Sequence, residues 1–564
     1  MKPAAWGVAV LMALGAWNAS AQTAPDAGQL MQQNQQNQRN APVLPRPGEG
    51  AQVATPPPTL QVAAGAKVAV KSFRFQGNTM LSDAQLQRTV TGYLDRPLDF
   101  KELQEVTSLV AKRYTAAGRL ARVFLPAQDV TEGVVTLQVM EAHYGGTQVE
   151  QSGQHVAPER AMAMLEQGQQ RGQALDLVAL DRALLLVGDL PGVQASASLV
   201  PGSGTGETAV RLSLRDKPTV TGAVGVDNGG TRSTGEARVN ASLALNGALG
   251  MGDLLIAQAS VNRGSSFVRL GASMPVGLAG TRVGVSANAL RYHLVGSDFE
   301  ALDARGTSSA LGLDISHPLV RSRDLNVLLQ GGVESKRFHN KANGADASVY
   351  DSQVWSLGLS ANEFDDVGGS GVTTGYLGAQ FGQLDLGGSP SQAFDAAGPR
   401  TDGSFRKLRY QLTRQQTLAA DWSAHASLQG QWANRNLDSS EKFYLGGPQG
   451  VRAYPVSEGG GATGLLASAE LRVRLGGGWR VAGFFDWGRV RTYVDENFLG
   501  ATAPNQYSLK GAGLSLDYAS PGGAEVSVIW ARRIGDNPLA DAQGRDLDGS
   551  LHRNRFWLLA SQPF

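Results

Sequence analysis

Near its C-terminus the chain carries a loop rich in glycine and proline, residues 446–455, with one cation, Arg452. A loop of this composition does not form a core element, so its cation is expected to dock against an anion elsewhere. The apolar strand that follows offers the carboxylate of Asp486, and a bidentate arginine is the best partner for such a group. The residues therefore predict an ion pair between Arg452 and Asp486. The alternative is a solvated Arg452, with Asp486 paired to Arg472 or Arg474.

The segments around these residues alternate with a period of two. From Leu465 to Leu475 the odd positions are apolar, and the even ones from 468 onward are serine, glutamate and arginine. This pattern is typical of a strand with one apolar face. It recurs from about residue 219 to the end of the chain, between turns rich in Gly, Asp and Asn, which favours a closed membrane barrel with a polar lumen. Asp486 would face that lumen together with Phe484, and Phe485 would face lipid.

The length of this region sets the expected number of strands. At roughly 9 to 11 residues a strand plus turns and longer outer loops, it accommodates about 16 antiparallel transmembrane strands, within a range of about 14 to 18. The last strand, Arg555 to Phe564, ends on a phenylalanine, which resembles the assembly signal of bacterial outer-membrane barrels. Aromatic residues gather at the membrane interfaces of such barrels. The candidates, for which ordinary packing is the alternative, are Trp479, Phe485, Trp487, Trp530 and Trp557.

The N-terminus predicts secretion across the inner membrane. Residues 1–21 combine a basic start, an apolar core and a small-residue cleavage site, which together indicate a signal peptide. Residues 22–66 form a leader with a Gln-rich piece and a Pro-rich linker. The stretch from Asp26 to Arg39 is compatible with a short polar helix, although composition alone favours disorder.

Two small α/β units are expected between leader and barrel, at residues 67–142 and 143–217. In the first, a strand precedes two helices that begin after Ser82 and Asp99, each with the spacing of a capping box. Two strands complete the unit, and the same order recurs in the second.

Composition excludes several functional classes. The net charge of +1 argues against nucleic acid as a partner, and the absence of cysteine excludes disulfides, thiolate metal sites and a cysteine nucleophile. The 7 histidines show no metal-ligand spacing, and no nucleophile-elbow motif occurs. A G-x-G-x-x-G match at residues 459–464 precedes an expected strand rather than a helix, so it fails as a phosphate site. The sequence therefore predicts no enzyme, no catalytic residue, no metal and no cofactor.

Several stretches resemble one protein family, the TpsB transporters of two-partner secretion, also called the haemolysin secretion/activation family, within the BamA-type superfamily. The two units resemble POTRA domains, with residues 73–79 as the opening of the first. Residues 227–235 and 250–253 resemble the family's first barrel hairpin, and residues 317–323 are a further family-like stretch. The similarity extends over nearly the whole chain after the signal peptide.

The loop motif carries the most specific similarity. Val451, Arg452, Ala453 and Tyr454 resemble the inward-folded sixth-loop motif of the superfamily, whose third residue is usually glycine. Ala453 departs from that pattern, which puts the backbone conformation of the tip in question because glycine tolerates positive φ better.

The resemblance implies a fold and a function. The barrel would span the bacterial outer membrane, with two POTRA domains in the periplasm, and would export a large TpsA-type exoprotein to the cell surface or medium. Arg452 and Asp486 would act as a conformational lock, and the Gln-rich segment as a helix that plugs the pore. Outer-membrane lipid and the barrel assembly machinery would be further partners. A BamA-like insertase and a solute porin are the alternatives.

The resemblance also implies a client-binding site in the periplasm. POTRA domains offer strand edges to unfolded chains, a form of β-augmentation. The groove between the helix at 100–117 and the strand Ala121 to Leu125 is the candidate, with Val123 and Leu125 at its apolar part. The alternative for both side chains is simple core packing.

Overall fold

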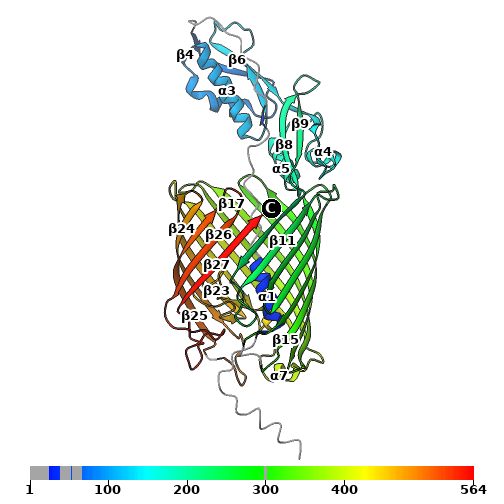
Figure 1. Ribbon diagram of the computed structural model, residues 1–564. Helices are drawn as coiled ribbons and strands as arrows, with labels where there is room; N and C mark the ends of the chain where they lie inside the picture. The colour runs from blue at the N-terminus through cyan, green and yellow to red at the C-terminus, as the bar shows by residue number, and fades with distance from the viewer. Residues whose placement is uncertain (1–24, 39–51, 54–66, 297–300, 503) are drawn as a thin grey trace, which may run out of the picture.

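The computed structural model of the protein describes residues 25–38, 52–53, 67–296, 301–502 and 504–564. The expected signal peptide and most of the Pro-rich linker lie outside these residues. Two small α/β units stand beside one end of a closed β-barrel, and a single helix lies inside the barrel (Figure 1). In the described ranges no helix combines the length and the apolarity that crossing a bilayer requires.

The first unit follows the element order expected from the sequence. Its elements are β2 (Val68–Val70), β3 (Ser72–Gln76), α2 (Asp83–Val90), the 3₁₀ turn η1 (Thr91–Tyr93), β4 (Arg96–Leu98), α3 (Phe100–Ala116), β5 (Ala121–Phe124) and β6 (Val134–Glu141). Both capping boxes form, with Ser82 and Asp99 as the N-caps. Strand β6 is central, parallel to β3 and antiparallel to β5. Val106, Val110 and Tyr114 of α3 join the buried core of this unit.

One buried carboxylate ties the first unit together. Glu141, at the end of β6, accepts hydrogen bonds from the backbone of Thr79 and Met80 and from the hydroxyl of Tyr114 at 2.8 Å. Burial opposes the charge, but these hydrogen bonds outweigh it and hold the pKa of Glu141 below its ordinary value. Sequence patterns missed this residue because its donors come from two segments far from it in the chain.

The second unit repeats the first with different strand lengths. Its elements are β7 (His143–Gln151), α4 (Pro158–Glu166), α5 (Leu177–Gly188), β8 (Val193–Pro201) and β9 (Glu207–Asp216). The sheet order is β1-β8-β9-β7, in which the two-residue strand β1 (Gln52–Val53) of the leader pairs parallel to β8. Helix α5 begins after Asp176, whose side chain caps it.

The barrel has 16 antiparallel strands, which confirms the number expected from its length. They are β10 (Val220–Asp227), β11 (Arg238–Asn246), β12 (Leu254–Asn262), β13 (Ser265–Val276), β14 (Thr281–His293), β15 (Arg305–Arg321), β16 (Leu325–Ala342), β17 (Ala345–Asp365), β18 (Gly371–Asp385), β19 (Gly403–Thr417), β20 (Trp422–Ala433), β23 (Thr463–Gly476), β24 (Trp479–Arg491), β25 (Gln506–Ala519), β26 (Glu525–Arg533) and β27 (Asn554–Pro563). Strands β27 and β10 close the ring, and the backbone of Phe564 exchanges hydrogen bonds with Gly222.

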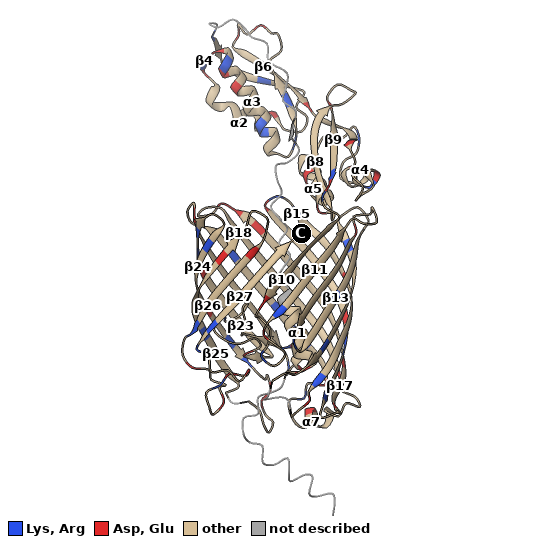
Figure 2. Cartoon of the chain, viewed as in Figure 1, with Lys and Arg blue, Asp and Glu red and all other residues tan. Residues whose placement is uncertain are grey.

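The alternating pattern separates the two faces of the barrel wall. On β17, Trp355 and Leu357 are exposed on the outside, whereas Ser360 is buried inside. On β24, Phe485 is exposed and Asp486 is buried, as the period of two predicts. Figure 2 shows the barrel strands mostly uncharged, with single acidic and basic positions among them. A short helix, α7 (Gln392–Ala397), lies in the connection between β18 and β19.

Candidate functional site

The connection between β20 and β23, residues 434–462, is termed the inward loop because it is buried against the barrel wall. Its elements are the 3₁₀ turn η2 (Ser439–Glu441) and the paired short strands β21 (Phe443–Tyr444) and β22 (Gly460–Gly461). Val451, Ala453 and Tyr454 have no exposed surface. They pack with Phe484 and Leu509 of the barrel strands. The loop is thus a folded element of the lumen rather than a solvated connection.

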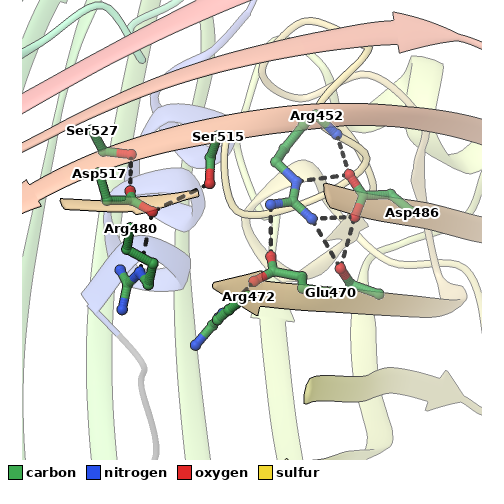
Figure 3. A network of polar contacts seen from close by, with 9 residues as sticks. Arg452, Glu470, Arg472, Arg480, Asp486, Ser515, Asp517 and Ser527 are labelled. Carbon is green, nitrogen blue, oxygen red and sulfur yellow. Dashed lines mark hydrogen bonds and ion pairs between the residues drawn. The ribbon is translucent and has the colours of Figure 1, made fainter. Parts of the chain in front are cut away.

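Arg452 lies against Asp486, as Figure 3 shows. Its Nε and Nη2 donate to the two carboxylate oxygens at 2.9 and 2.7 Å, and its backbone N–H donates to Oδ2 at 3.1 Å. The hydroxyl of Ser468 donates to the same carboxylate at 2.7 Å. Asp486 has no exposed surface and Arg452 is 8% exposed. The structure thus brings together the two residues expected to pair, in the bidentate geometry that suits a buried carboxylate.

A second carboxylate balances the charge of this cluster. Arg452 Nη1 donates to Glu470 at 2.7 Å, and Arg472 donates to the other oxygen of Glu470 at 2.6 and 2.8 Å. The Arg452 guanidinium also lies over the ring of Phe484, 3.4 Å from its centroid. Two cations and two anions leave no net charge, which lowers the penalty for burying them. Arg472 pairs with Glu470, so the alternative partner considered for Asp486 is not adopted.

A more exposed ion pair lies on the neighbouring strands. Arg480 Nε donates to Asp517 at 3.3 Å, and Ser515 and Ser527 donate to the same carboxylate (Figure 3). The Arg480 side chain is 47% exposed. Arg480 is therefore an ion-paired arginine of the barrel wall that is much less buried than Arg452.

Ala453 does not strain the loop tip. Its φ is not positive. Within the inward loop, Ser457 is the non-glycine residue that has a positive φ. Its methyl group instead packs on Gly511, where an added Cβ would stand 2.6 Å from the Ala453 Cβ. The alanine therefore requires a glycine on the facing strand, and it takes no left-handed conformation.

Tyr454 and the backbone of Arg452 are held by the last two barrel strands. The Arg533 guanidinium lies 4.4 Å from the centroid of the Tyr454 ring. Trp557 Nε1 donates to the Arg452 carbonyl at 2.8 Å. Trp557 is only 5% exposed, so its expected place in an interfacial belt is wrong. Phe556 and Leu558 face outward, and the period of two along β27 then turns Trp557 inward.

The inward loop is also joined to the connection between β26 and β27, residues 534–553. Glu458, fully buried, accepts from Asn537 at 2.8 Å and from the backbone of Leu547 at 3.0 Å. The same amide group of Asn537 donates to Asp546 at 2.9 Å, and Asp546 pairs with Arg533. Because these partners lie far from the loop in sequence, no local pattern could have identified them.

A helix, α1 (Ala27–Gln38), occupies the lumen beside the inward loop. The Ala27 N–H donates to Asn340 of β16 at 2.8 Å, and the Ser439 hydroxyl donates to Asp26 at 2.8 Å. Gln35 Nε2 donates to Glu334 on the barrel wall at 2.9 Å. Leu30 is buried against the wall with Met31. The helical alternative for the Gln-rich segment is therefore the one adopted.

Two lysines of the wall fix the start of the inward loop. Glu441 lies between Lys336 of β16, at 2.9 Å, and Lys407 of β19, with which it also forms an ion pair. Each of the three side chains is almost fully buried. Helix α1 rests on this part of the loop, since Gln32 Nε2 donates to the Lys442 carbonyl at 3.0 Å. The helix therefore contacts the part of the loop that the two lysines fix.

The family-like stretch at 317–323 lies where the second unit meets the barrel. Arg321 forms a bidentate pair with Asp189, both contacts at 2.7 Å. Arg323 pairs with Asp181 at 2.6 Å. These pairs join the end of β15 and the following turn to α5 and its C-terminus. They hold the second unit at the barrel mouth.

Val123 and Leu125, the expected client-binding residues, lie in the first unit on and just after β5. Strand β5 is an edge of the three-stranded sheet β3-β6-β5. Both side chains are half-buried and pack against the core of that unit. The edge position fits the expected groove, and the core contacts fit the alternative.

No group of three or more His, Asp or Glu side chains suitable for a metal ion occurs within the described ranges. The glycine run at 459–464 leads into β23, so a strand follows it as expected.

Comparison with known proteins identifies relatives over nearly the whole chain. A profile of the haemolysin secretion/activation proteins ShlB/FhaC/HecB matches residues 206–516, and a ShlB-type POTRA domain profile matches residues 68–142. The heme/hemopexin transporter protein HuxB of Haemophilus influenzae is 24% identical over 553 residues, which cover 96% of this chain and 95% of HuxB.

Two solved structures share the architecture. CdiB from Escherichia coli superposes with a TM-score of 0.67 at 22% identity, covering 95% of this chain and 98% of that one. BamA from Haemophilus ducreyi, lacking POTRA domains 1–3, gives a TM-score of 0.54 at 14% identity, covering 88% and 100%. At these identities the structures bear on the fold alone.

Proposed function

The chain belongs to the haemolysin secretion/activation protein family, and on that premise we propose that it is the outer-membrane pore for a large partner exoprotein of the TpsA type. The barrel spans the outer membrane, and the N-terminal units lie in the periplasm. The exoprotein would be recognised in the periplasm and exported to the cell surface or medium. No catalytic step is needed for this task, and the relatives are transporters.

One observation carries the proposal: the lumen is filled by elements that can leave it. Helix α1 and the inward loop are held by side-chain contacts, and neither forms a strand of the barrel ladder. Their departure would break no hydrogen bond between barrel strands. A wide passage could therefore open while the wall keeps the closed pairing that lipid requires.

Arg452 and Asp486 are the lock in this proposal. Their pairing holds the loop tip in the lumen, and opening would expose both charges to water, where each is well solvated. Helix α1 is the plug. Gln35 of the helix bonds to Glu334, which pairs with Lys336 at 3.2 Å, and Lys336 pairs with Glu441 of the loop. Removal of the plug would therefore loosen the loop as well.

Client recognition would use the edge of the first POTRA domain. An extended chain can add to β5 through backbone hydrogen bonds, with Val123 and Leu125 beside it. Lipid would contact the apolar outer face of the barrel, and the barrel assembly machinery would act on the last strand during biogenesis.

Two alternatives use the same fold differently. A BamA-like insertase would share every part, but the transporter relative HuxB matches over 96% of this chain, whereas the likeness to BamA concerns the fold alone. A solute porin would have no use for two periplasmic units or for a helix in the lumen.

The test is a proteomic comparison of culture medium and outer membranes from wild type, a deletion strain and the complemented deletion. We expect one large exoprotein to disappear from the medium and surface of the deletion strain and to return on complementation, with other barrels unchanged. A general fall in barrel proteins would indicate an insertase. No change in either fraction would leave a pore for small solutes.

A further inference from the structure

A cavity of about 150 Å³ lies where the second unit meets the barrel mouth. Most of its wall is carbon, and the charged residues Arg160, Asp189 and Arg282 also line it. The second unit contributes Met164, Leu186 and Leu190, and the barrel contributes Pro275, Pro318 and Leu328. An apolar cavity of roughly this size admits a benzene ring in other proteins, so it has room for one large apolar side chain.

The barrel strands line the cavity with their lumen faces. Asn326 and Leu328 have the same orientation on β16 as Gln330, which lines a lumen pocket further along the strand. Ser360 belongs to the buried inner face of β17. The cavity is therefore at the periplasmic entrance of the lumen, between the second unit and the pore.

Two residues that line the cavity, Arg160 and Asn326, each have a buried hydrogen-bond donor without a partner among the described residues. Asn326 is 2% exposed, and its Oδ1 accepts from Arg321 at 2.8 Å and from the Ser322 N–H at 3.3 Å. Its Nδ2 has no acceptor among the described residues. Arg321 is itself fixed by Asp189 of the second unit. The amide is thus oriented by the junction, and its buried Nδ2 lacks an acceptor beside the cavity that Asn326 lines, which is costly unless an acceptor arrives.

We propose that this cavity is an entry subsite for the exported chain: it takes one large apolar side chain of an extended segment, while Asn326 Nδ2 donates to a backbone carbonyl beside it. An unfolded polypeptide supplies both groups at adjacent atoms, and the donor reads no sequence beyond the apolar side chain. The subsite rests on the proposed export function and deepens it. It would favour clients whose extended segments carry leucine, isoleucine or phenylalanine.

Two substitutions address the two halves of the subsite. Leu328→Trp fills the cavity from the barrel side, and Asn326→Asp keeps the acceptor contacts with Arg321 and Ser322 but removes the donor. The control is Leu325→Trp, which enlarges an exposed, outward-facing residue of the same strand. Each protein is first checked for heat-modifiable mobility, so that only assembled barrels are compared.

We expect export to fall about tenfold in Leu328→Trp, the order of magnitude that burial of one apolar side chain represents. Asn326→Asp should show a smaller loss, and Leu325→Trp none. The measurement is the amount of the exoprotein, identified by the comparison above, in the medium of the complemented deletion strain. Normal export by an assembled Leu328→Trp protein would overturn the subsite.

A labelling experiment tests occupancy directly. The chain contains no cysteine, so Leu328→Cys introduces a single thiol, with Leu325→Cys as the control. Export is jammed by fusing a stably folded domain to the exoprotein, and the rate of reaction with N-ethylmaleimide is compared with and without the jammed client. We expect the client to protect position 328 and not 325. If Cys at position 328 reacts slowly both with and without the client, a lipid chain occupies the cavity. If it reacts quickly in both cases, the cavity is an empty void. Either result would overturn the proposal.

The outcomes separate this subsite from the proposed function. If the wild-type chain fails to restore any exoprotein to the deletion strain, the export function itself is wrong. If it does restore export and the filled variant does so equally, only the subsite is wrong.

Discussion

Among single residues, Asp486 depends most on the docked loop. It accepts hydrogen bonds from the side chain and backbone of Arg452 and from Ser468, and it has no contact with water. An undocked loop would leave the carboxylate facing an open, hydrated lumen, where its charge is tolerated. The ion pair therefore bears on which loop conformation is populated and not on whether the barrel folds.

Arg452→Ala should assemble normally but export poorly. Removal of one partner of a buried ion pair costs about 3–5 kcal/mol, because the other charge stays buried without compensation, so the docked loop would lose its preference over undocked states. Heat-modifiable mobility on gels reports the barrel, and the exoprotein in the medium reports export. Arg480→Ala is the matched control, because that arginine is half-exposed on the same barrel wall and its loss should change little. Normal secretion by an assembled, full-length Arg452→Ala protein would contradict the lock.

Residue patterns predicted the pairing of Arg452 with Asp486 but not the contacts of Arg452 with Glu470 and Phe484. Charge and spacing left Arg472 and Arg474 as alternative partners of Asp486, and the similarity of residues 451–454 to the sixth-loop motif favoured Arg452. The expectation for Trp557 was wrong because it rested on residue type alone. Phe556 and Leu558 face outward, so the period of two along β27 turns Trp557 toward the lumen. The packing of Ala453 on Gly511 could not be foreseen, because the two residues belong to segments whose contact arises only in the folded barrel.

Among the elements, helix α1 shows how a weakly helical segment becomes ordered. Its glutamines bond to the Lys442 carbonyl and to Glu334, partners that composition does not reveal. Isolated helices of this length are marginal in water, so packing must supply most of the stability. The helices of the first unit, by contrast, were predictable because their capping boxes are local and both signals lie within a few residues.

Gly28→Val should displace helix α1 from the lumen. A Cβ at this position would stand 2.7 Å from both the Ser439 and the Tyr350 hydroxyl oxygen, and two further methyl groups would make the contact impossible without movement. We expect a higher single-channel conductance in planar bilayers, approaching that of a protein lacking residues 26–40. Gln29→Val is the control, because it carries the same β-branched penalty at a half-buried position whose backbone N–H donates to Asp26. If Gly28→Val and the deletion both conduct like wild type, the helix is not a plug.

For the whole molecule, the strand count and the order of domains followed from sequence because they depend on repeating patterns. Alternation with a period of two recurs through the barrel region, and turns rich in Gly, Asp and Asn separate the alternating segments. The junctions did not follow, because they join segments that lie far apart in the sequence, as Arg321 and Asp189 do. Those junctions place the second unit at the mouth of the lumen.

This placement predicts the route of the exported chain. The barrel seam is its shortest ladder, since β10 pairs with β27 over five residues and with β11 over eight. Parting the seam would leave backbone groups without partners in hydrocarbon, at several kcal/mol for each group. Passage along the lumen, past an undocked loop and helix, requires no such loss. Export should therefore continue through a barrel whose seam cannot open.

A disulfide across the seam tests this route. Val224 and Gln562 are paired across β10 and β27, and the double substitution Val224→Cys with Gln562→Cys would hold the only two thiols of the chain. Val268→Cys with Ala289→Cys, across β13 and β14, is the matched control within the wall. We expect oxidised and reduced forms of both proteins to export equally. If oxidation blocked export only in the seam variant and a reductant restored it, the client would pass through the seam, as an insertase requires, and the axial route would be wrong.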